Sequence, residues 1–123
     1  MVLATSNREH RLLFVNYVER VTEVELADAR SELQTLLADL PPDFRLLADL
    51  SRLDSMEAEC VTELGRTMEL ISQHGVGLIL RVIPDASKDI GLNILTIFHY
   101  PRRPRVINCQ NLAQAIQKLA LWK

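Results

Sequence analysis

The stretch FRLLADLSRLDSMEAEC, residues 44 to 60, decides the fold class. Its first seven residues, FRLLADL, place apolar side chains on both faces of an extended chain, which is typical of a buried strand. A helix is predicted next, from about Met56 to His74, with Gly75 as a left-handed cap at its end. Its inner face would carry apolar residues at helical spacing: Val61, Leu64, Met68 and Ile71. Residues 49 to 60 thus form a corner between a strand and a helix, where α/β proteins often place functional groups.

The rest of the chain repeats this alternation. The other strands are predicted at residues 11–18, 76–83 and 105–109, with a short antiparallel partner at residues 2–5. The other helices are predicted from a capping box at Thr22 and Glu25 to the Pro41–Pro42 pair, from Ser87 through residues 88–99, and from Asn111 onward. Helices between successive strands favour mainly parallel pairing with right-handed crossovers. We expect one α/β domain that spans residues 1–123.

The composition is that of an ordinary globular domain. Of its 123 residues 48% are hydrophobic and 24% charged, and the net charge is -2. A general nucleic-acid binder would show a broad basic excess, so nucleic acid is not an expected partner. No apolar run is long enough to span a bilayer and the start does not read as a signal peptide, so we expect no membrane partner and a cytoplasmic location. Cys60 and Cys109 are isolated in sequence and are interpreted as reduced, packed thiols.

Enzyme motifs are not found. The four glycines form no phosphate-cradling loop, and Glu19 alone follows the first strand where a receiver domain needs several acidic residues. The three histidines share no metal-binding spacing, and no serine sits in a G-x-S-x-G elbow. The sequence therefore predicts no catalytic residue, no metal ligand and no cofactor.

Two loops carry concentrated charge. The basic string PRRPR, residues 101 to 105, is interpreted as a solvated loop rather than a phosphate grip. Asp85, Lys88 and Asp89 would follow a central strand at its carboxyl end, the usual edge for ligands. Helix capping by Ser87 and Asp89 would explain much of this loop without a ligand, so a ligand loop stays an open alternative.

The order of elements and several short motifs resemble the STAS domain, the fold of anti-sigma factor antagonists. The motifs are the strand LLADLS, the corner, a helix closing in HG, the strand GLILRVI, and the final RVINCQNLAQAIQKL. This resemblance implies a small mixed, mainly parallel sheet with about four helices packed mostly on one side. It also implies a corner that begins Asp-Leu-Ser and continues to an Asp-Ser-Ser/Thr-Gly motif, whose serine accepts phosphate.

The chain departs from that motif. When the family motif is aligned to this chain without gaps from Asp49, its phosphate-accepting serine falls on Ala58, between Glu57 and Glu59. A shift of three residues would instead make Ser55 the candidate phosphoacceptor. We prefer the gapless alignment because it keeps the helix length and puts the apolar Met56 before the corner. The carboxylates could imitate a permanently phosphorylated state, although good first-turn residues are the simpler interpretation.

The resemblance implies a non-enzymatic signalling module from a bacterium that binds another protein, such as a serine kinase or an anti-sigma factor. We define the acidic corner as residues 54 to 61, and its predicted partner-binding residues are Asp54, Ser55, Glu57, Ala58, Glu59 and Val61. The alternative is a small-molecule sensor or enzyme that uses four strand-end residues: Asp54, Asp85, Lys88 and Asp89. A third hypothesis is a homodimer through an exposed sheet edge or helix face.

Overall fold

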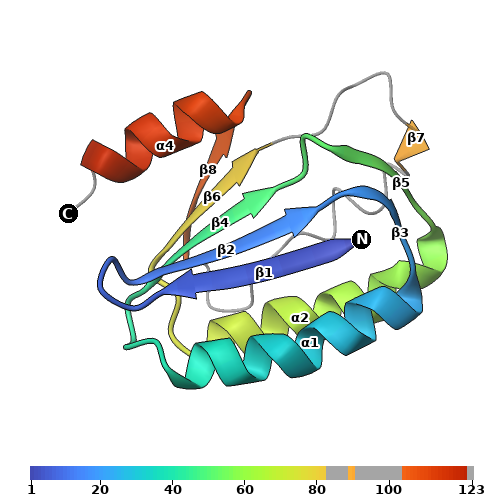
Figure 1. Cartoon of the computed structure of the whole chain (residues 1–123), viewed down its shortest axis with the longest axis horizontal. Helices are drawn as coiled ribbons and strands as arrows, with labels where there is room; N and C mark the ends of the chain where they lie inside the picture. The colour runs from blue at the N-terminus through green and yellow to red at the C-terminus, as the bar shows by residue number, and fades with distance from the viewer. Residues whose placement is uncertain (83–88, 91–103, 122–123) are drawn as a thin grey trace.

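A computed structural model of the chain describes residues 1–82, 89–90 and 104–121. Five strands form one sheet in the order β1-β2-β4-β6-β8 (Figure 1). Their bounds are Val2–Asn7 for β1, Leu12–Tyr17 for β2, Arg45–Asp49 for β4, Leu78–Val82 for β6 and Arg105–Cys109 for β8. β1 is antiparallel to β2, whereas β2, β4, β6 and β8 run parallel. The predicted first hairpin and mainly parallel sheet are confirmed.

A second, smaller sheet lies beyond the carboxyl ends of these strands. Its three parallel strands have the order β3-β5-β7 and the bounds Glu19–Val21, Leu53–Met56 and Asp89–Ile90. Glu19 has a positive φ of 58°, which turns the chain between β2 and β3. The sequence predicts none of these strands. The helix predicted over residues 88–99 is wrong at Asp89 and Ile90, and its other residues lie outside the described part of the chain.

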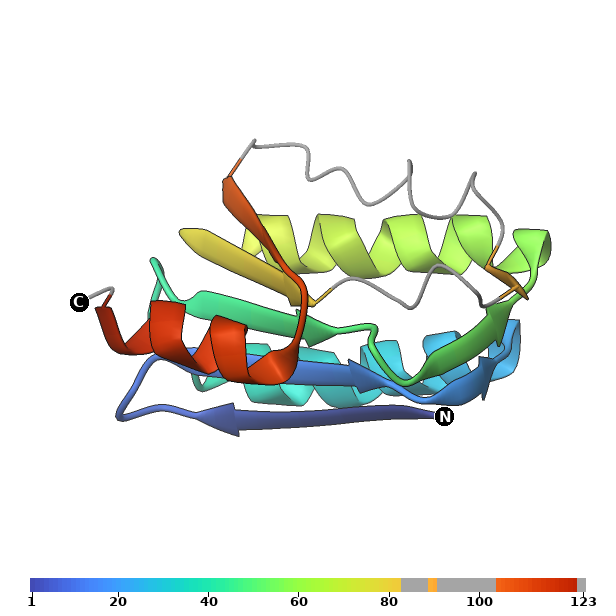
Figure 2. The same ribbon diagram turned by 90° about the horizontal axis from the view of Figure 1, so that it is seen from above.

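Three α-helices lie among the described residues: α1 (Glu23–Ala38), α2 (Val61–Gln73) and α4 (Leu112–Leu121). α1 and α2 lie side by side against one face of the five-stranded sheet (Figure 1). α4 covers part of the other face, as the view from above also shows (Figure 2). The helices thus pack mostly on one side, as predicted, and the described residues contain three α-helices where about four were predicted. None of the described helices is long and apolar enough to cross a membrane.

The start of α2 also differs from the prediction. Met56 ends the strand β5, Ala58–Cys60 make a single 3-10 turn, and α2 begins only at Val61. The expected single bend from strand to helix is therefore interrupted by a short extra strand. That strand forms because Leu53 and Met56 become buried, at 0% and 3% exposure, when β5 pairs with β3.

The start of α1 follows the predicted capping box. The hydroxyl of Thr22 accepts a hydrogen bond from the N–H of Glu25 at 3.3 Å and donates one to the Glu25 carboxylate at 3.1 Å. One of the free N–H groups of the first turn is thereby satisfied, and the negative charge lies at the positive end of the helix dipole.

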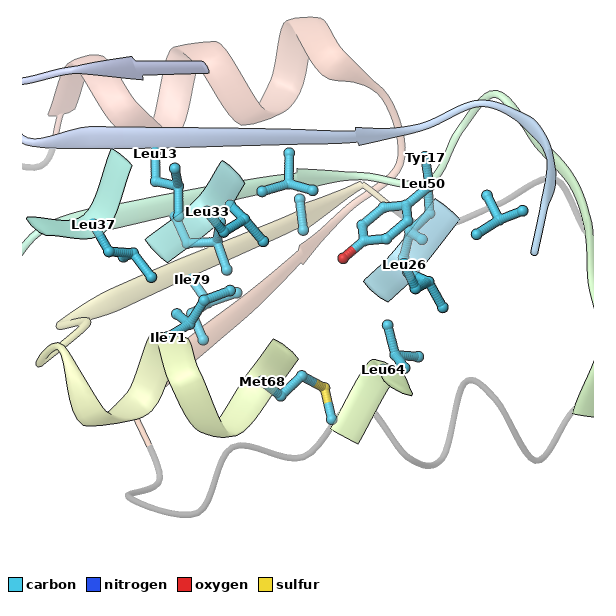
Figure 3. Close-up of a cluster of buried hydrophobic side chains, with 14 of the residues drawn as sticks. Leu13, Tyr17, Leu26, Leu33, Leu37, Leu50, Leu64, Met68, Ile71 and Ile79 are labelled. Carbon is cyan, nitrogen blue, oxygen red and sulfur yellow. The ribbon is translucent and has the colours of Figure 1, made fainter. Parts of the chain in front are cut away.

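The main core lies between the helix pair α1–α2 and the sheet (Figure 3). Its labelled side chains are at most 4% exposed: Leu13, Tyr17, Leu26, Leu33, Leu37, Leu50, Leu64, Met68, Ile71 and Ile79. Burial of one such side chain stabilises a fold by about 1.5–3 kcal/mol. The predicted inner face of α2 is confirmed, with Val61 half-buried at its start. Cys60 and Cys109 are buried and free, as expected.

Gly75 ends α2 in the predicted left-handed conformation. Its φ is +86°, and its N–H donates to the carbonyl of Ser72 at 3.0 Å. A Cβ at this position would lie 3.3 Å from the Cβ of Pro42, which is closer than ordinary van der Waals contact. Glycine is therefore required both by its backbone conformation and by the close approach of the loop before β4.

We predict opposite effects of alanine at two glycines of this region. Gly75→Ala should lower the free energy of unfolding by about 1–2 kcal/mol, because L-residues are strained at positive φ. Gly65→Ala is the matched control: no atom outside its own helix lies within 4 Å of a Cβ there, and it should raise stability by about 0.5–1 kcal/mol. Urea unfolding followed by circular dichroism measures both. Equal effects at the two positions would contradict the assigned cap.

Candidate functional site

β4 ends in a turn built from its own polar residues. Asp49 is 2% exposed, and its Oδ1 accepts hydrogen bonds from the Ser51 N–H at 2.9 Å and the Ser51 hydroxyl at 2.6 Å. The N–H of Leu50 donates to the Val82 carbonyl at 3.0 Å. An aspartate bonded to the backbone two residues later makes an Asx-turn. The Asp-Leu-Ser sequence therefore stops β4 and directs the chain into β5.

β5 carries the first residues of the acidic corner as the central strand of the smaller sheet. Ser55 pairs in register with Arg20 of β3 and with Asp89 of β7. Asp54 is exposed and Ser55 is half-buried, while Met56 packs into the core. Pairing on both sides and the burial of Met56 hold this part of the corner in a defined position.

Three consecutive exposed residues lie at the start of the 3-10 turn. Glu57, Ala58 and Glu59 are all exposed, and buried residues flank them on both sides, Met56 before and Cys60 after. The side chain of Cys60 is 1% exposed, and its thiol donates to the Val21 carbonyl at 3.5 Å. The turn is therefore fixed at both ends while its two carboxylates face solvent.

Cys60 lies close to three carboxylates. Burial is the main cause that raises the pKa of its thiol, and the negative charges of Glu23, Glu57 and Glu59 raise it further. The thiolate is the reactive form of cysteine, so this environment keeps Cys60 protonated and unreactive at neutral pH. Glu23 at the start of α1 thus adds its negative charge to those of Glu57 and Glu59 around this thiol.

Arginines bind two glutamates of this region in different environments. Arg20 Nη2 lies 2.5 Å from Glu57 Oε1, and the two side chains are 65% and 58% exposed. Arg30 of α1 pairs with Glu63 of α2 across the helix interface, where the side chains are only 23% and 17% exposed. The hydrogen bond from Arg30 is the main cause that lowers the pKa of Glu63. The first pair can exchange with another ligand in water, whereas the second ties the two helices together.

The structure places one residue of the predicted ligand loop beside the acidic corner. Asp89, predicted in a ligand loop, lies on the strand next to Ser55 of the acidic corner. Asp85 and Lys88, the other two residues of that loop, lie outside the described part of the chain. Residues 1–82, 89–90 and 104–121 contain no cluster of three or more His, Cys, Asp or Glu side chains that could hold a metal ion.

The sequence did not reveal the contributions of Arg20, Glu23 and Arg30. Arg20 lies on an unpredicted strand, 37 residues away from its partner Glu57, so no local spacing indicates the pair. Glu23 reaches the corner only because α1 and α2 begin at the same end of the molecule (Figure 1). Arg66 lies 3.3 Å from Glu63 at a spacing of three residues, a helical pair that the sequence could have indicated.

Comparison with solved structures identifies this architecture. The anti-sigma factor antagonist SpoIIAA in its unphosphorylated form matches over 98% of both chains, with a TM-score of 0.61 and 14% sequence identity. The chain has a SpoIIAA-like fold. The STAS-like architecture that the short motifs predicted is thereby confirmed. No protein-family model and no curated protein matches the sequence.

Two further structures share this SpoIIAA-like fold. An uncharacterised protein of the DUF3478 family from Shewanella loihica PV-4, described as having a SpoIIAA-like fold, has a TM-score of 0.67 and 13% identity; the match covers 97% of this chain and 92% of that one. The phosphorylated form of SpoIIAA, a Bacillus cell fate determinant, has a TM-score of 0.59 and 14% sequence identity. The match covers 97% of this chain and 99% of that one. Because the sequence identities are only 13–14%, the similarity shown is that of the fold.

We predict that Glu63→Gln destabilises the chain in a pH-dependent way. Arg30 lowers the pKa of Glu63 below its ordinary value of 4.5, so the charged carboxylate stabilises the folded state above that pH. This stabilisation is lost as the pH falls through the folded-state pKa, because both proteins then carry a neutral side chain. The difference in unfolding free energy should therefore be full at neutral pH and disappear in acid.

Urea unfolding at a series of pH values measures this difference. Glu69→Gln, at an exposed position of the same helix, is the matched control and should show little change at any pH. A Glu63→Gln effect that stays constant from neutral to acidic pH would contradict the assigned ion pair.

Proposed function

We propose that the chain is a non-enzymatic protein-interaction module of the anti-sigma factor antagonist type, which binds a protein partner through the acidic corner. Its fold, shared with a protein described as an anti-sigma factor antagonist, supports this proposal. The partner would be a serine kinase or an anti-sigma factor of a bacterium. Two free, buried cysteines agree with a cytoplasmic setting. The contacts would come from the corner residues: Asp54, Ser55, Glu57, Ala58, Glu59 and Val61.

One observation carries the proposal: exposed carboxylates are held on a rigid support. Glu57 and Glu59 are exposed, whereas the residues that flank their turn, Met56 and Cys60, are 3% and 1% exposed. A surface that is already ordered loses little conformational entropy on binding, so more of the contact energy remains for affinity. Half-buried Val61 adds an apolar contact beside the charges.

The electrostatics of the corner favour a basic partner surface. Glu57 is bound to Arg20 in an exposed ion pair, which contributes at most about 1 kcal/mol. A partner arginine or lysine could replace Arg20 at little cost, while Glu23 and Glu59 extend the negative region. Complementary charge would raise the association rate and help to reject acidic partners.

We propose that this binding does not depend on phosphorylation. The 3-10 turn begins at Ala58, which has no hydroxyl group and lies between the two glutamates Glu57 and Glu59. Ser55, the candidate phosphoacceptor, lies instead in the middle strand of the smaller sheet and is half-buried. A phosphate on Ser55 would repel the neighbouring Asp54 and Glu57 and would have to lose its hydration in a docked complex, so it would weaken binding.

Charge reversal at the corner tests the docking surface. Glu57→Lys with Glu59→Lys should weaken binding to a purified anti-sigma-type serine kinase from the same organism by roughly tenfold or more, because two attractions become repulsions. Glu69→Lys, an exposed acidic position on α2, should change the affinity by no more than about twofold. Isothermal titration calorimetry measures the affinity of the kinase for the unchanged chain, for the double variant and for Glu69→Lys. Equal affinities for the double variant and the unchanged chain would refute the proposal.

Mass spectrometry tests the independence from phosphate. After incubation of the chain with such a kinase and ATP, we expect no phosphate on Ser55, and we expect Ser55→Ala to bind as the unchanged chain does. Phosphate on Ser55 together with weaker binding of the phosphorylated form would show instead that the corner is a switch.

A further inference from the structure

The outer edge of β1 is unprotected. β1 is the last strand of the five-stranded sheet, and no strand of the described chain lies beyond it. It has no charged residue and no proline, and its register with β2 runs through six residue pairs without a bulge. Proteins usually protect an edge strand by one of these devices, because its unpaired N–H and C=O groups can bind another strand. Leu3 is also 48% exposed on one face of this edge.

An acidic row on α1 runs beside this edge. Glu25, Glu32 and Asp39 recur at intervals of seven residues, or about two helical turns, so they lie along one side of the helix, with Asp28 between the first two. Glu25 lies 2.8 Å from the amino group of Met1, and Asp39 lies 3.7 Å from Arg8 Nη1. Because Met1 and Arg8 flank β1, the acidic row follows the whole strand, as the parallel course of β1 and α1 shows (Figure 1).

The middle of the acidic row is not neutralised. Asp28 and Glu32 are exposed, and neither makes an ion pair with any described residue. Like charges four residues apart destabilise a helix by a few tenths of a kcal/mol. A cationic ligand along this side of α1 would remove that repulsion.

We propose that the β1 edge binds an extended segment of a protein partner in which lysine or arginine occupies alternate positions. The segment would add a strand to the sheet through main-chain hydrogen bonds with β1. Same-face residues of a strand repeat about every 6.7 Å, and Asp28 and Glu32 are about 6 Å apart along the helix axis. Basic side chains on the α1 face would thus meet the acidic row in succession, and apolar side chains on the other face would cover Leu3.

Charge selects this occupant over a second copy of the chain. If two β1 strands paired about a twofold axis, the α1 helices would lie on the same face and their acidic rows would approach each other. Like charges across an interface are unfavourable, whereas a basic strand is attracted. The surface is separate from the acidic corner and does not rest on the function proposed for it.

A short labelled peptide in which lysine alternates with valine tests the proposal on the 123-residue chain. We expect binding that weakens with added salt, measured by fluorescence anisotropy, and slower hydrogen exchange of the Val2–Asn7 amides in the complex. The same peptide with N-methylated alternate amides keeps its charge but lacks the donors for strand pairing, and it should bind at least roughly tenfold more weakly.

Two protein variants test whether the acidic row attracts the peptide, rather than negative charge elsewhere on the chain. Asp28→Asn with Glu32→Gln should weaken peptide binding by roughly tenfold, and Glu69→Gln should leave it within about twofold. The proposal would be overturned if the peptide left the hydrogen exchange of the β1 amides unchanged. Equal losses of peptide affinity in the Asp28–Glu32 double variant and in Glu69→Gln would also overturn it. So would light scattering that shows a dimer whose formation protects the same amides, since a second copy would then occupy the edge.

Discussion

The apolar contact between the helix pair α1–α2 and one face of the five-stranded sheet is the interaction on which the other features depend. It buries the large side chains of both helices and holds the two helices against the sheet. Because α1 and α2 begin at the same end of the molecule, the negative charge of Glu23 in α1 acts on the same thiol as those of Glu57 and Glu59 in the acidic corner. The Arg30–Glu63 pair crosses the same interface and aligns the two helices. The position of the proposed docking surface thus depends on how the core packs.

Much of the architecture could be predicted from local patterns. The buried strands at residues 44–50 and 76–83, the Thr22 cap and the Gly75 cap all follow from apolar runs and capping chemistry within a few neighbouring residues. The smaller sheet could not be predicted in this way. Its strands are two to four residues long, and Leu53–Met56 shows no alternation, so only pairing between distant segments makes them extended. The α2 start was misplaced for the same reason.

The acidic corner is a prediction from the sequence, and sequence patterns could not describe its surroundings. The exposure of Glu57 and Glu59 agrees with the sequence-based hypothesis of an acidic docking surface. The contributions of Arg20 and Glu23 depend on the tertiary fold, which no spacing reveals. The attraction of both surfaces for basic partners should weaken as the ionic strength rises.

Chemical-shift mapping by nuclear magnetic resonance tests the central claim most directly. The labelled, unphosphorylated chain would be titrated with an anti-sigma-type serine kinase that binds it. Our account predicts that the largest changes fall on the backbone amides of residues 54 to 63 and of Arg20, with the core amides nearly unchanged. Changes confined to α4 and β8, on the other face of the sheet, would contradict it.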